Sequence, residues 1–230
     1  MLDAMIFDFD GVVVDSEPIH LACFRDVLAG CGIELASEDY YEKYLGFDDH
    51  DCFQAVMVDN GRRVDERQIA EMTGQKTLLV QKAFAESIRP LPGAIELMRA
   101  ARSAGAALGI CSGALRKEIL LAGRTVGAVE LVDVVVAAED VRAGKPDPEG
   151  YILALKLLNE KKVRLRSATS PPVRICPSGV WVVEDSPAGV QAGKNAGMSV
   201  LAVTNSYSHA ALTDADRVVN SLTEITPADL

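Results

Sequence analysis

The sequence has few of the features that mark secreted or membrane-spanning proteins. Its five cysteines are odd in number and scattered, with no CxxC pair, which argues against a disulfide framework and for a reducing compartment. The first residues carry no positive charge of the kind that opens a secretory signal. No apolar run approaches the ~20 residues of a membrane-spanning helix. We therefore expect a cytoplasmic protein with no membrane partner.

Basic residues are also scarce. Lys and Arg together number 23 against 33 Asp and Glu, which gives a formal net charge of -10. A nucleic-acid backbone or an anionic membrane would repel such a chain, so neither is expected as a partner. What the sequence does have is apolar content: 49% of its 230 residues are hydrophobic, enough to bury one core and a smaller second domain.

Short apolar runs recur along the chain and are separated by helical stretches. The runs are AMIFDF (4–9), ALGICS (107–112), DVVVAA (133–138), GVWVVE (179–184) and SVLAVT (199–204). Alternation of such runs with helices is typical of a parallel sheet with helices on both faces. The predicted fold class is therefore α/β, with a doubly wound parallel sheet.

The residues between the first and second runs follow a helical pattern instead. Apolar residues recur at helical spacing after Pro18 and again before Ser87. The stretch IRPLPG (88–93) has the prolines and glycine of a linker that ends at a helix start. We therefore predict a core domain of residues 1–15 and 90–230, with a helical domain of residues 16–89 inserted into it.

One connection stands out by its charge and length. The stretch KKVRLRSATSPPVRICPSG (161–179) is basic and longer than an ordinary helix-to-strand connection. Because it precedes a strand, it is expected at the amino-terminal edge of the sheet, opposite the edge where doubly wound sheets bind ligands. We interpret it as a solvated loop rather than a partner-binding surface.

Polar side chains follow the predicted strands at the points where they end. The candidates are Asp8 and Asp10 after the first run, Ser112 after the second, Lys145 in GKPDPEGY after the third, and Glu184 with Asp185 after the fourth. The carboxyl ends of parallel strands meet at one edge of the sheet, where ligands bind. Four carboxylates there need a cation, and all-oxygen ligands favour Mg²⁺ over zinc. Lys145 and Ser112 are suited to holding a phosphoryl group.

Each motif also has a purely structural interpretation. A DxD sequence at a strand end is often a turn or a helix cap. Lys145 alone could be a solvated surface residue, and Ser112 with Gly113 could begin a turn. The sequence EDSP also fits a helix start capped by Ser186. These interpretations account for one motif each, whereas a phosphate site accounts for all four in this order.

Taken together, the four motifs resemble those of the haloacid dehalogenase superfamily, and within it the β-phosphoglucomutase-like phosphatases. They are DFDGVVVDS, ICSG, GKPDPEGY and VVEDSPAGVQAGKNAG, and they span nearly the whole chain. The resemblance implies a Rossmann-like catalytic core with an α-helical cap inserted directly after the first motif. It further implies Mg²⁺ as the cofactor and a small phosphorylated metabolite as the substrate.

The resemblance also implies a role for each residue. Asp8 is expected to take the phosphoryl group as the nucleophile, and Asp10 to act as general acid and then as general base. Strand alternation would point both aspartates to the same side. The residues expected to bind Mg²⁺ are Asp8, Asp10 through its backbone carbonyl, and Asp185. Glu184 is expected either to bind the ion directly or to contact the residues that do. The implied phosphate-binding residues are Ser112, Gly113 and Lys145. Haloacid dehalogenases and phosphonatases lack an aspartate at the position of Asp10, which argues against dehalogenation.

Whether water or a sugar hydroxyl attacks the phosphorylated Asp8 separates a phosphatase from a mutase. β-Phosphoglucomutase places an arginine in the cap loop after Gly46 and a lysine after the second-motif serine, which together suit a second phosphate. This chain has the acidic sequence FDDHD (47–51) in the first place and Arg116 in the second. An acidic loop repels a spare phosphate, so we predict hydrolysis of a sugar or polyol monophosphate.

Two alternatives stay open. Arg116 could replace the lysine of the mutase, and His20 matches a histidine of its cap linker, although His20 fits equally well as a residue packed on the cap helix. A non-catalytic phospho-acceptor domain that signals through Asp8 ranks lower, because such domains carry no inserted cap and need no acid at Asp10.

Overall fold

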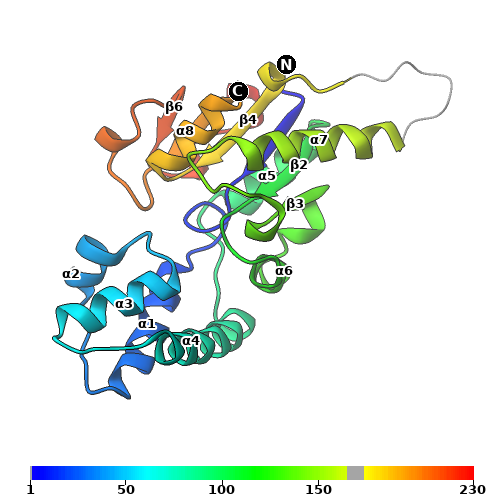
Figure 1. The fold of residues 1–230 in the computed structure, drawn as a ribbon. Helices are drawn as coiled ribbons and strands as arrows, with labels where there is room; N and C mark the ends of the chain where they lie inside the picture. The colour runs from blue at the N-terminus through cyan, green and yellow to red at the C-terminus, as the bar shows by residue number, and fades with distance from the viewer. Residues whose placement is uncertain (1, 165–173) are drawn as a thin grey trace. The chain divides into compact units, whose positions relative to one another are not determined.

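The computed structural model of the chain describes residues 2–164 and 174–230 (Figure 1). It consists of two compact units, Met1–Asp15 with Arg89–Leu230 and Ser16–Ile88, which we call the core unit and the helical unit. The predicted boundary put residue 89 in the inserted domain, whereas here it groups with the core unit. The assignment of the two units as catalytic core and cap stays a prediction.

A parallel sheet of six strands forms the centre of the core unit. The strands are β1 (Ala4–Phe7), β2 (Ala107–Cys111), β3 (Val134–Val136), β4 (Val180–Glu184), β5 (Ser199–Val203) and β6 (Arg217–Val219). Their order is β3-β2-β1-β4-β5-β6, so the chain builds outward from β1 in both directions. The predicted α/β class, with a Rossmann-like doubly wound sheet and an inserted helical segment, is confirmed; β6 was not predicted.

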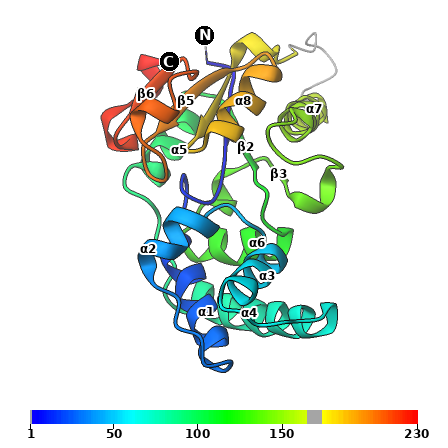
Figure 2. The ribbon, with the colours of Figure 1, turned by 60° about the vertical axis from the view of Figure 1, so that its left-hand side comes forward.

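Both faces of the sheet are covered. The side chains of β1 point alternately to opposite faces, yet all four residues of this strand have 0% exposed surface. The helices of the core unit are α5 (Ala94–Ser103), α6 (Arg116–Thr125), α7 (Glu149–Arg164) and α8 (Pro187–Asn195). On one face, Ala4 and Ile6 share a hydrophobic cluster with Tyr151 of α7 and Val190 of α8. Figure 2 gives a second view of these helices around the sheet.

The first strand is shorter than predicted. It ends at Phe7, and Asp10 lies in the turn that follows, where the amide of Gly11 donates to the carbonyl of Val14 at 2.9 Å. Gly11 has a φ of 75°, a conformation that favours glycine. The prediction that strand alternation orients Asp8 and Asp10 is therefore wrong, because a tight turn, not a strand, carries the second aspartate.

Two linkers join the units, and they pair with each other. Val14 and Pro90 form an antiparallel bridge, and the amide of Asp15 donates to the carbonyl of Arg89 at 3.2 Å. The chain therefore leaves the core unit and re-enters it at one place.

The helical unit has a hydrophobic core of its own. Its helices are α1 (Glu17–Ala29), α2 (Ser37–Asp39), α3 (Asp49–Asp59) and α4 (Glu66–Glu86), with a π-helical segment at Tyr40–Tyr44. Phe24, Phe53 and Ile69 belong to the cluster that these helices enclose. A capping box starts α4, since the side chains of Asp65 and Gln68 accept from each other's backbone amides at 2.8 and 3.0 Å.

The basic stretch 161–179 is only partly a loop. Helix α7 continues through Arg164, and a 3-10 turn forms at Pro177–Gly179 before β4. The loop prediction is therefore wrong for residues 161–164, because the Lys and Arg residues there are good helix formers and extend α7. Residues 165–173 of this stretch lie outside the described part of the chain.

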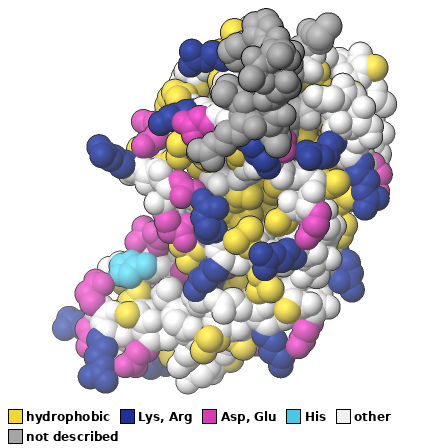
Figure 3. All heavy atoms as spheres, turned by 90° about the vertical axis from the view of Figure 1, so that its right-hand side faces the viewer, with side chains coloured by type: hydrophobic (Ala, Val, Ile, Leu, Met, Phe, Trp, Pro, Cys, Tyr) yellow, Lys and Arg dark blue, Asp and Glu magenta, His cyan; other side chains and the backbone are white. Residues whose placement is uncertain are grey.

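The described surface carries charged side chains of both signs. On the face shown in Figure 3, basic and acidic side chains are interspersed.

Among the helices within 2–164 and 174–230, none combines the length and the apolar character needed to cross a membrane. All five cysteines are free thiols.

Candidate active site

Three neighbouring strands bring polar side chains to one edge of the sheet. β1 pairs with β2 on one side and with β4 on the other, which places Phe7 opposite Ile110 and Val183. The predicted site residues come directly afterwards: Asp8 after β1, Ser112 after β2, and Glu184 with Asp185 at the end of β4. All four are buried. Because the strands are parallel and in register, their carboxyl ends bring these residues together.

Lys145 reaches the same edge from the loop after β3. Its ammonium group donates to Oδ1 of Asp8 and to Oε1 of Glu184, the latter at 2.5 Å. Burial opposes a charge on Lys145, but the two carboxylates raise its pKa well above the ordinary lysine value. Lys145 therefore stays protonated and ties together three segments that are far apart in the sequence.

Glu184 has 0% exposed surface and accepts hydrogen bonds on both oxygens. Oε1 accepts from Lys145 and from the hydroxyl of Tyr151, both at 2.5 Å. Oε2 accepts from the amide of Asp185 and the hydroxyl of Ser186, both at 3.1 Å. Burial and the nearby Glu184 raise the pKa of Tyr151, so its hydroxyl remains a donor. Glu184 thus holds Lys145 in place and fixes the start of α8.

The acidic side chains of the site could hold a metal ion. Asp8, Glu184 and Asp185 each place a carboxylate oxygen within 4.8 Å of the others. Three carboxylates beside the single ammonium of Lys145 leave a net charge that one divalent cation offsets. Burial raises the pKa of Asp8 well above its usual value and that of Asp185 to about 7, and a cation would keep both ionised. The donors are all oxygens, which suits Mg²⁺.

Asp10 lies within reach of Ser112. The hydroxyl of Ser112 donates to Oδ2 of Asp10 at a long 3.4 Å and accepts from the amide of Ala114 at 3.0 Å. The Ser112 amide donates to the carbonyl of Val136 at 3.0 Å, which anchors the turn through Gly113 to β3. Asp10 is half-buried, so its carboxylate is more open to solvent than the three described above.

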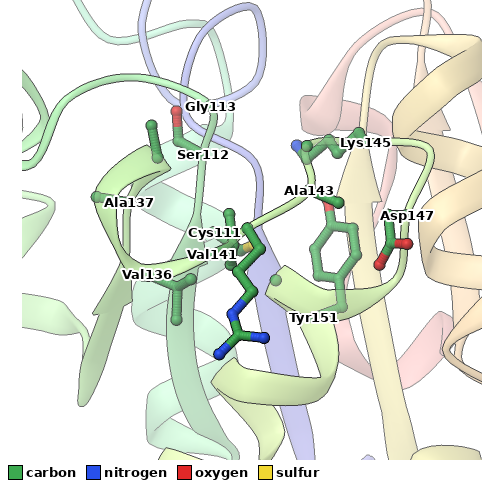
Figure 4. A pocket seen from close by; sticks show the side chains of 14 residues that line it. Cys111, Ser112, Gly113, Val136, Ala137, Val141, Ala143, Lys145, Asp147 and Tyr151 are labelled. Atoms are coloured by element: carbon green, nitrogen blue, oxygen red, sulfur yellow. The ribbon is translucent and has the colours of Figure 1, made fainter.

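A pocket of about 200 Å³ opens between the loops that follow β2 and β3. Figure 4 shows Ser112 and Gly113 on one side of this pocket, and Lys145 with the ring of Tyr151 on the other. Cys111 also lines it, but burial raises the pKa of this thiol to about 12, so Cys111 is not a nucleophile at neutral pH. The predicted phosphate-binding residues Ser112, Gly113 and Lys145 all line this pocket, and Arg142 and Asp147 line it as well.

Two further predicted residues have other partners. The guanidinium of Arg116 donates to Asp140 and to the carbonyl of Val135 at 3.2 Å, which ties it to the β3 side of the core unit. His20 belongs to the helical unit, where its Nδ1 lies 2.9 Å from Nζ of Lys76. Burial, assisted by Lys76, lowers the pKa of His20 to about 3, so the neutral ring accepts this hydrogen bond.

The helical unit contains a buried cation that the sequence did not reveal. Lys76 is 1% exposed, forms an ion pair with Asp49, and lies 3.9 Å from the centre of the Phe24 ring. A lysine on an amphipathic helix usually faces solvent, so no pattern in the sequence marks it. Asp49 belongs to the acidic stretch that was predicted to repel a second phosphate, and it offsets the charge of Lys76 within the same unit.

The loop after β5 adds two residues that the sequence also did not reveal. The hydroxyl of Ser206 donates to Oδ2 of Asp185, and the side-chain amide of Asn205 donates to the carbonyl of Gly11 at 2.7 Å. The surrounding sequence TNSYS has the composition of an ordinary turn. A fifth segment of the chain therefore contacts the site.

Comparison with known proteins gives consistent matches over most of the chain. The family model described as haloacid dehalogenase-like hydrolase matches residues 5–203. Validoxylamine A 7'-phosphate phosphatase from Streptomyces hygroscopicus subsp. limoneus is 27% identical over 225 residues, covering 98% of this chain and 96% of the relative. Hexitol phosphatase A from Escherichia coli (strain K12) is 30% identical over 224 residues, covering 96% and 92%. The structure of a mutant of CbbY from Rhodobacter sphaeroides in complex with xylulose-(1,5)bisphosphate is similar with a TM-score of 0.83 at 25% identity, covering 100% of this chain and 99% of that one.

Proposed function

Because this chain belongs to the haloacid dehalogenase-like hydrolases, we propose that it is a Mg²⁺-dependent phosphatase that hydrolyses a small sugar or polyol monophosphate through a phosphorylated Asp8. The prediction of an enzyme of this superfamily is confirmed by the family match. The observation that carries the proposal is the bridge from Lys145 to Asp8 and Glu184, beside Asp185. A buried carboxylate next to a fixed cation can approach an anionic phosphate with less repulsion.

The chemistry takes two steps. In the first, a carboxylate oxygen of Asp8 bonds to phosphorus while the bond to the leaving oxygen breaks, and Asp10 gives that oxygen its proton. In the second, water attacks the phosphorus, the now ionised Asp10 accepts a proton from it, and the bond to Asp8 breaks. Inorganic phosphate leaves, and both aspartates return to their starting states.

The remaining residues hold charge and position. Asp8, the backbone carbonyl of Asp10 and Asp185 would hold Mg²⁺, with Glu184 beside them, and the bound ion supplies positive charge against the phosphoryl oxygens. Lys145 would exchange its bond with Asp8 for one to a phosphoryl oxygen, because Glu184 keeps its ammonium group in place. The other groups proposed to bind phosphate are the Ser112 hydroxyl and the Gly113 backbone.

The proposed substrate class rests on the relatives and on the helical unit. Two relatives are named as phosphatases, for validoxylamine A 7'-phosphate and for hexitol, which supports a small polyhydroxylated substrate. Lys76 is already paired with Asp49, so its charge is offset and attracts a second phosphate less, which favours a monophosphate. We expect the helical unit to act as a cap that closes over the substrate by movement at the two linkers.

A β-phosphoglucomutase-like mutase is the second candidate. The place of His20 in the helical unit favours it, because His20 matches a cap-linker histidine of the mutase, although its ring is paired with the buried Lys76. The bonds of Arg116 to Asp140 and Val135 count against the role that a mutase would give it, since its guanidinium is already engaged. A phospho-acceptor domain without turnover ranks third.

A phosphate-release screen separates the candidates. The purified protein would be incubated with a panel of sugar and polyol monophosphates in the presence of Mg²⁺, with EDTA as the control, and separately with β-glucose 1-phosphate and its bisphosphate activator. We expect rapid phosphate release that EDTA abolishes. Isomerisation without net release would identify a mutase, and a long-lived phosphoryl group on Asp8 would identify an acceptor domain. No release and no phosphorylation of Asp8 across the panel would overturn the proposal.

A further inference from the structure

The loop after β5 contacts the site at two points. Asn205 donates from its side-chain amide to the carbonyl of Gly11 at 2.7 Å. The next residue, Ser206, donates from its hydroxyl to Oδ2 of Asp185. One short segment therefore contacts both the turn that carries Asp10 and the carboxylate proposed to bind Mg²⁺.

These contacts converge on Gly11. A Cβ atom at this position would lie 2.0 Å from Oδ2 of Asp185 and 2.9 Å from Oγ of Ser206. Both distances are shorter than van der Waals contact, so the turn, the carboxylate and the loop meet with no room for a side chain. Oδ2 of Asp185 is held between the backbone of Gly11 and the hydroxyl of Ser206, which fixes the direction of the whole carboxylate.

The loop itself is anchored to the sheet. The amide of Thr204 donates to the carbonyl of Val219 at 3.0 Å, and its hydroxyl donates to Asn220 at 3.3 Å. Asn205 is exposed and Ser206 half-buried, so burial of apolar surface does not explain why either side chain is directed toward the site. A rigid support of this kind is what precise metal and catalytic geometry needs.

We propose that Ser206 and Asn205 are positioning residues of the active site. Ser206 orients Asp185 for Mg²⁺, and Asn205 holds the Gly11 turn so that Asp10 faces the leaving oxygen. This inference rests on the proposed phosphatase function. Hydrogen-bond partners of metal-binding side chains typically change metal affinity or activity by ~10–100-fold when they are removed.

The first test measures Mg²⁺ affinity directly, by calorimetric titration of the substrate-free protein. In Ser206→Ala we expect Mg²⁺ affinity to fall by ~10–100-fold, and in Ser206→Thr, which keeps the hydroxyl, we expect most of it to remain. Ser208→Ala, in the same loop, is the matched control and should bind Mg²⁺ as the wild type does. A purely structural role would instead lower thermal stability and leave Mg²⁺ affinity unchanged.

The second test concerns Asn205, whose exposed position makes misfolding on substitution unexpected. In Asn205→Ala we expect kcat at saturating Mg²⁺ to fall by ~10-fold or more while KM changes little, because the acid Asp10 acts in the transition state. If Ser206→Ala binds Mg²⁺ like the wild type and Asn205→Ala keeps its kcat, the inference is wrong and the phosphatase proposal stands. If the wild type neither binds Mg²⁺ nor releases phosphate, the proposed phosphatase function is wrong, and the inference that rests on it is wrong as well.

Discussion

Tyr151 donates a 2.5 Å hydrogen bond to Oε1 of Glu184, the same oxygen that accepts from Lys145. The phenol is 1% exposed, so water does not replace it easily. This contact links the packing of α7 to the position of Lys145, the only cation described within the carboxylate cluster. A substitution at Tyr151 is therefore expected to change how firmly Glu184 holds Lys145.

Tyr151→Phe removes this donor and keeps the ring. Hydrogen bonds to charged groups contribute ~1.5–3 kcal/mol, so we expect the free energy of unfolding to fall by about that amount. We also expect a several-fold higher KM, because Lys145 is held less firmly. Denaturant unfolding and steady-state kinetics measure the two effects. Tyr44→Phe, which removes a 2.6 Å bond to Asp59 in the helical unit, should lower stability without raising KM, and equal KM changes in both variants would contradict this role of Tyr151.

Gly189→Ala should disable the site through Glu184. A Cβ atom at Gly189 would lie 1.9 Å from both Cδ and Oε1 of Glu184, so the carboxylate or α8 must move. We expect a loss of at least ~3 kcal/mol in the free energy of unfolding and a large fall in activity. Gly74→Ala is the matched control in α4, because no atom lies within 4 Å of its added Cβ. It should stabilise the protein by ~1 kcal/mol, and a similar loss from both substitutions would argue against a clash with Glu184.

Asp8→Asn should abolish turnover and retain Mg²⁺ binding. The amide is a poor nucleophile, so we expect kcat to fall by more than ~10³-fold, while its oxygen and Asp185 remain available to the ion. Phosphate release measures the first effect and calorimetric titration with Mg²⁺ the second. Wild-type turnover in this variant would remove the proposed mechanism.

Asp10→Ala tests the acid separately from the nucleophile. Loss of general acid catalysis should lower kcat by ~10²–10⁴-fold for sugar and polyol phosphates. A substrate with a good leaving group, such as p-nitrophenyl phosphate, needs less protonation, and we expect a smaller fall for it. The same fall for both kinds of substrate would show that Asp10 is not the acid.

The helical unit should lose stability in acid through His20. Its pKa is about 3 in the folded protein against an ordinary 6.5, so between these values the unfolded chain binds more protons than the folded one. The contribution of the neutral His20 to the free energy of unfolding is complete above pH 6.5. It is lost as the pH falls toward 3, at up to ~1.4 kcal/mol per pH unit. We expect urea unfolding of His20→Gln to depend less on pH between 7 and 4.5 than that of the wild type. His209→Gln, at an exposed position, serves as the control, and parallel slopes for His20→Gln and the wild type would contradict the prediction.

Repeated patterns made the architecture predictable from the sequence. All five apolar runs became strands, β1 to β5, because buried parallel strands read as continuous apolar stretches. The ends shifted slightly, and β3 kept only Val134–Val136 of the run 133–138. Strand β6 spans Arg217–Val219 only, which is too short and too polar around its ends to stand out. The meeting of Asp8, Ser112, Lys145 and Glu184 followed from the rule that parallel strands end at one edge.

Other parts of the site carry no local signal. Tyr151 reads as a core aromatic of a helix, and Ser206 reads as a turn residue; their importance comes from partners that lie 33 and 21 positions away in the chain. Lys76 is similar, since its burial depends on Asp49 and on the ring of Phe24. Such long-range polar contacts require the tertiary structure, because no periodicity in the sequence reports them.

The bridge between Val14 and Pro90 closes the chain of the core unit before the helical unit begins. The entropy of closing an inserted segment grows only slowly with its length, so a larger or smaller set of helices could occupy the same place without disturbing the strand register. On the proposed function, exchange of this one module would change substrate preference and leave the phosphoryl chemistry of the core unit as it is.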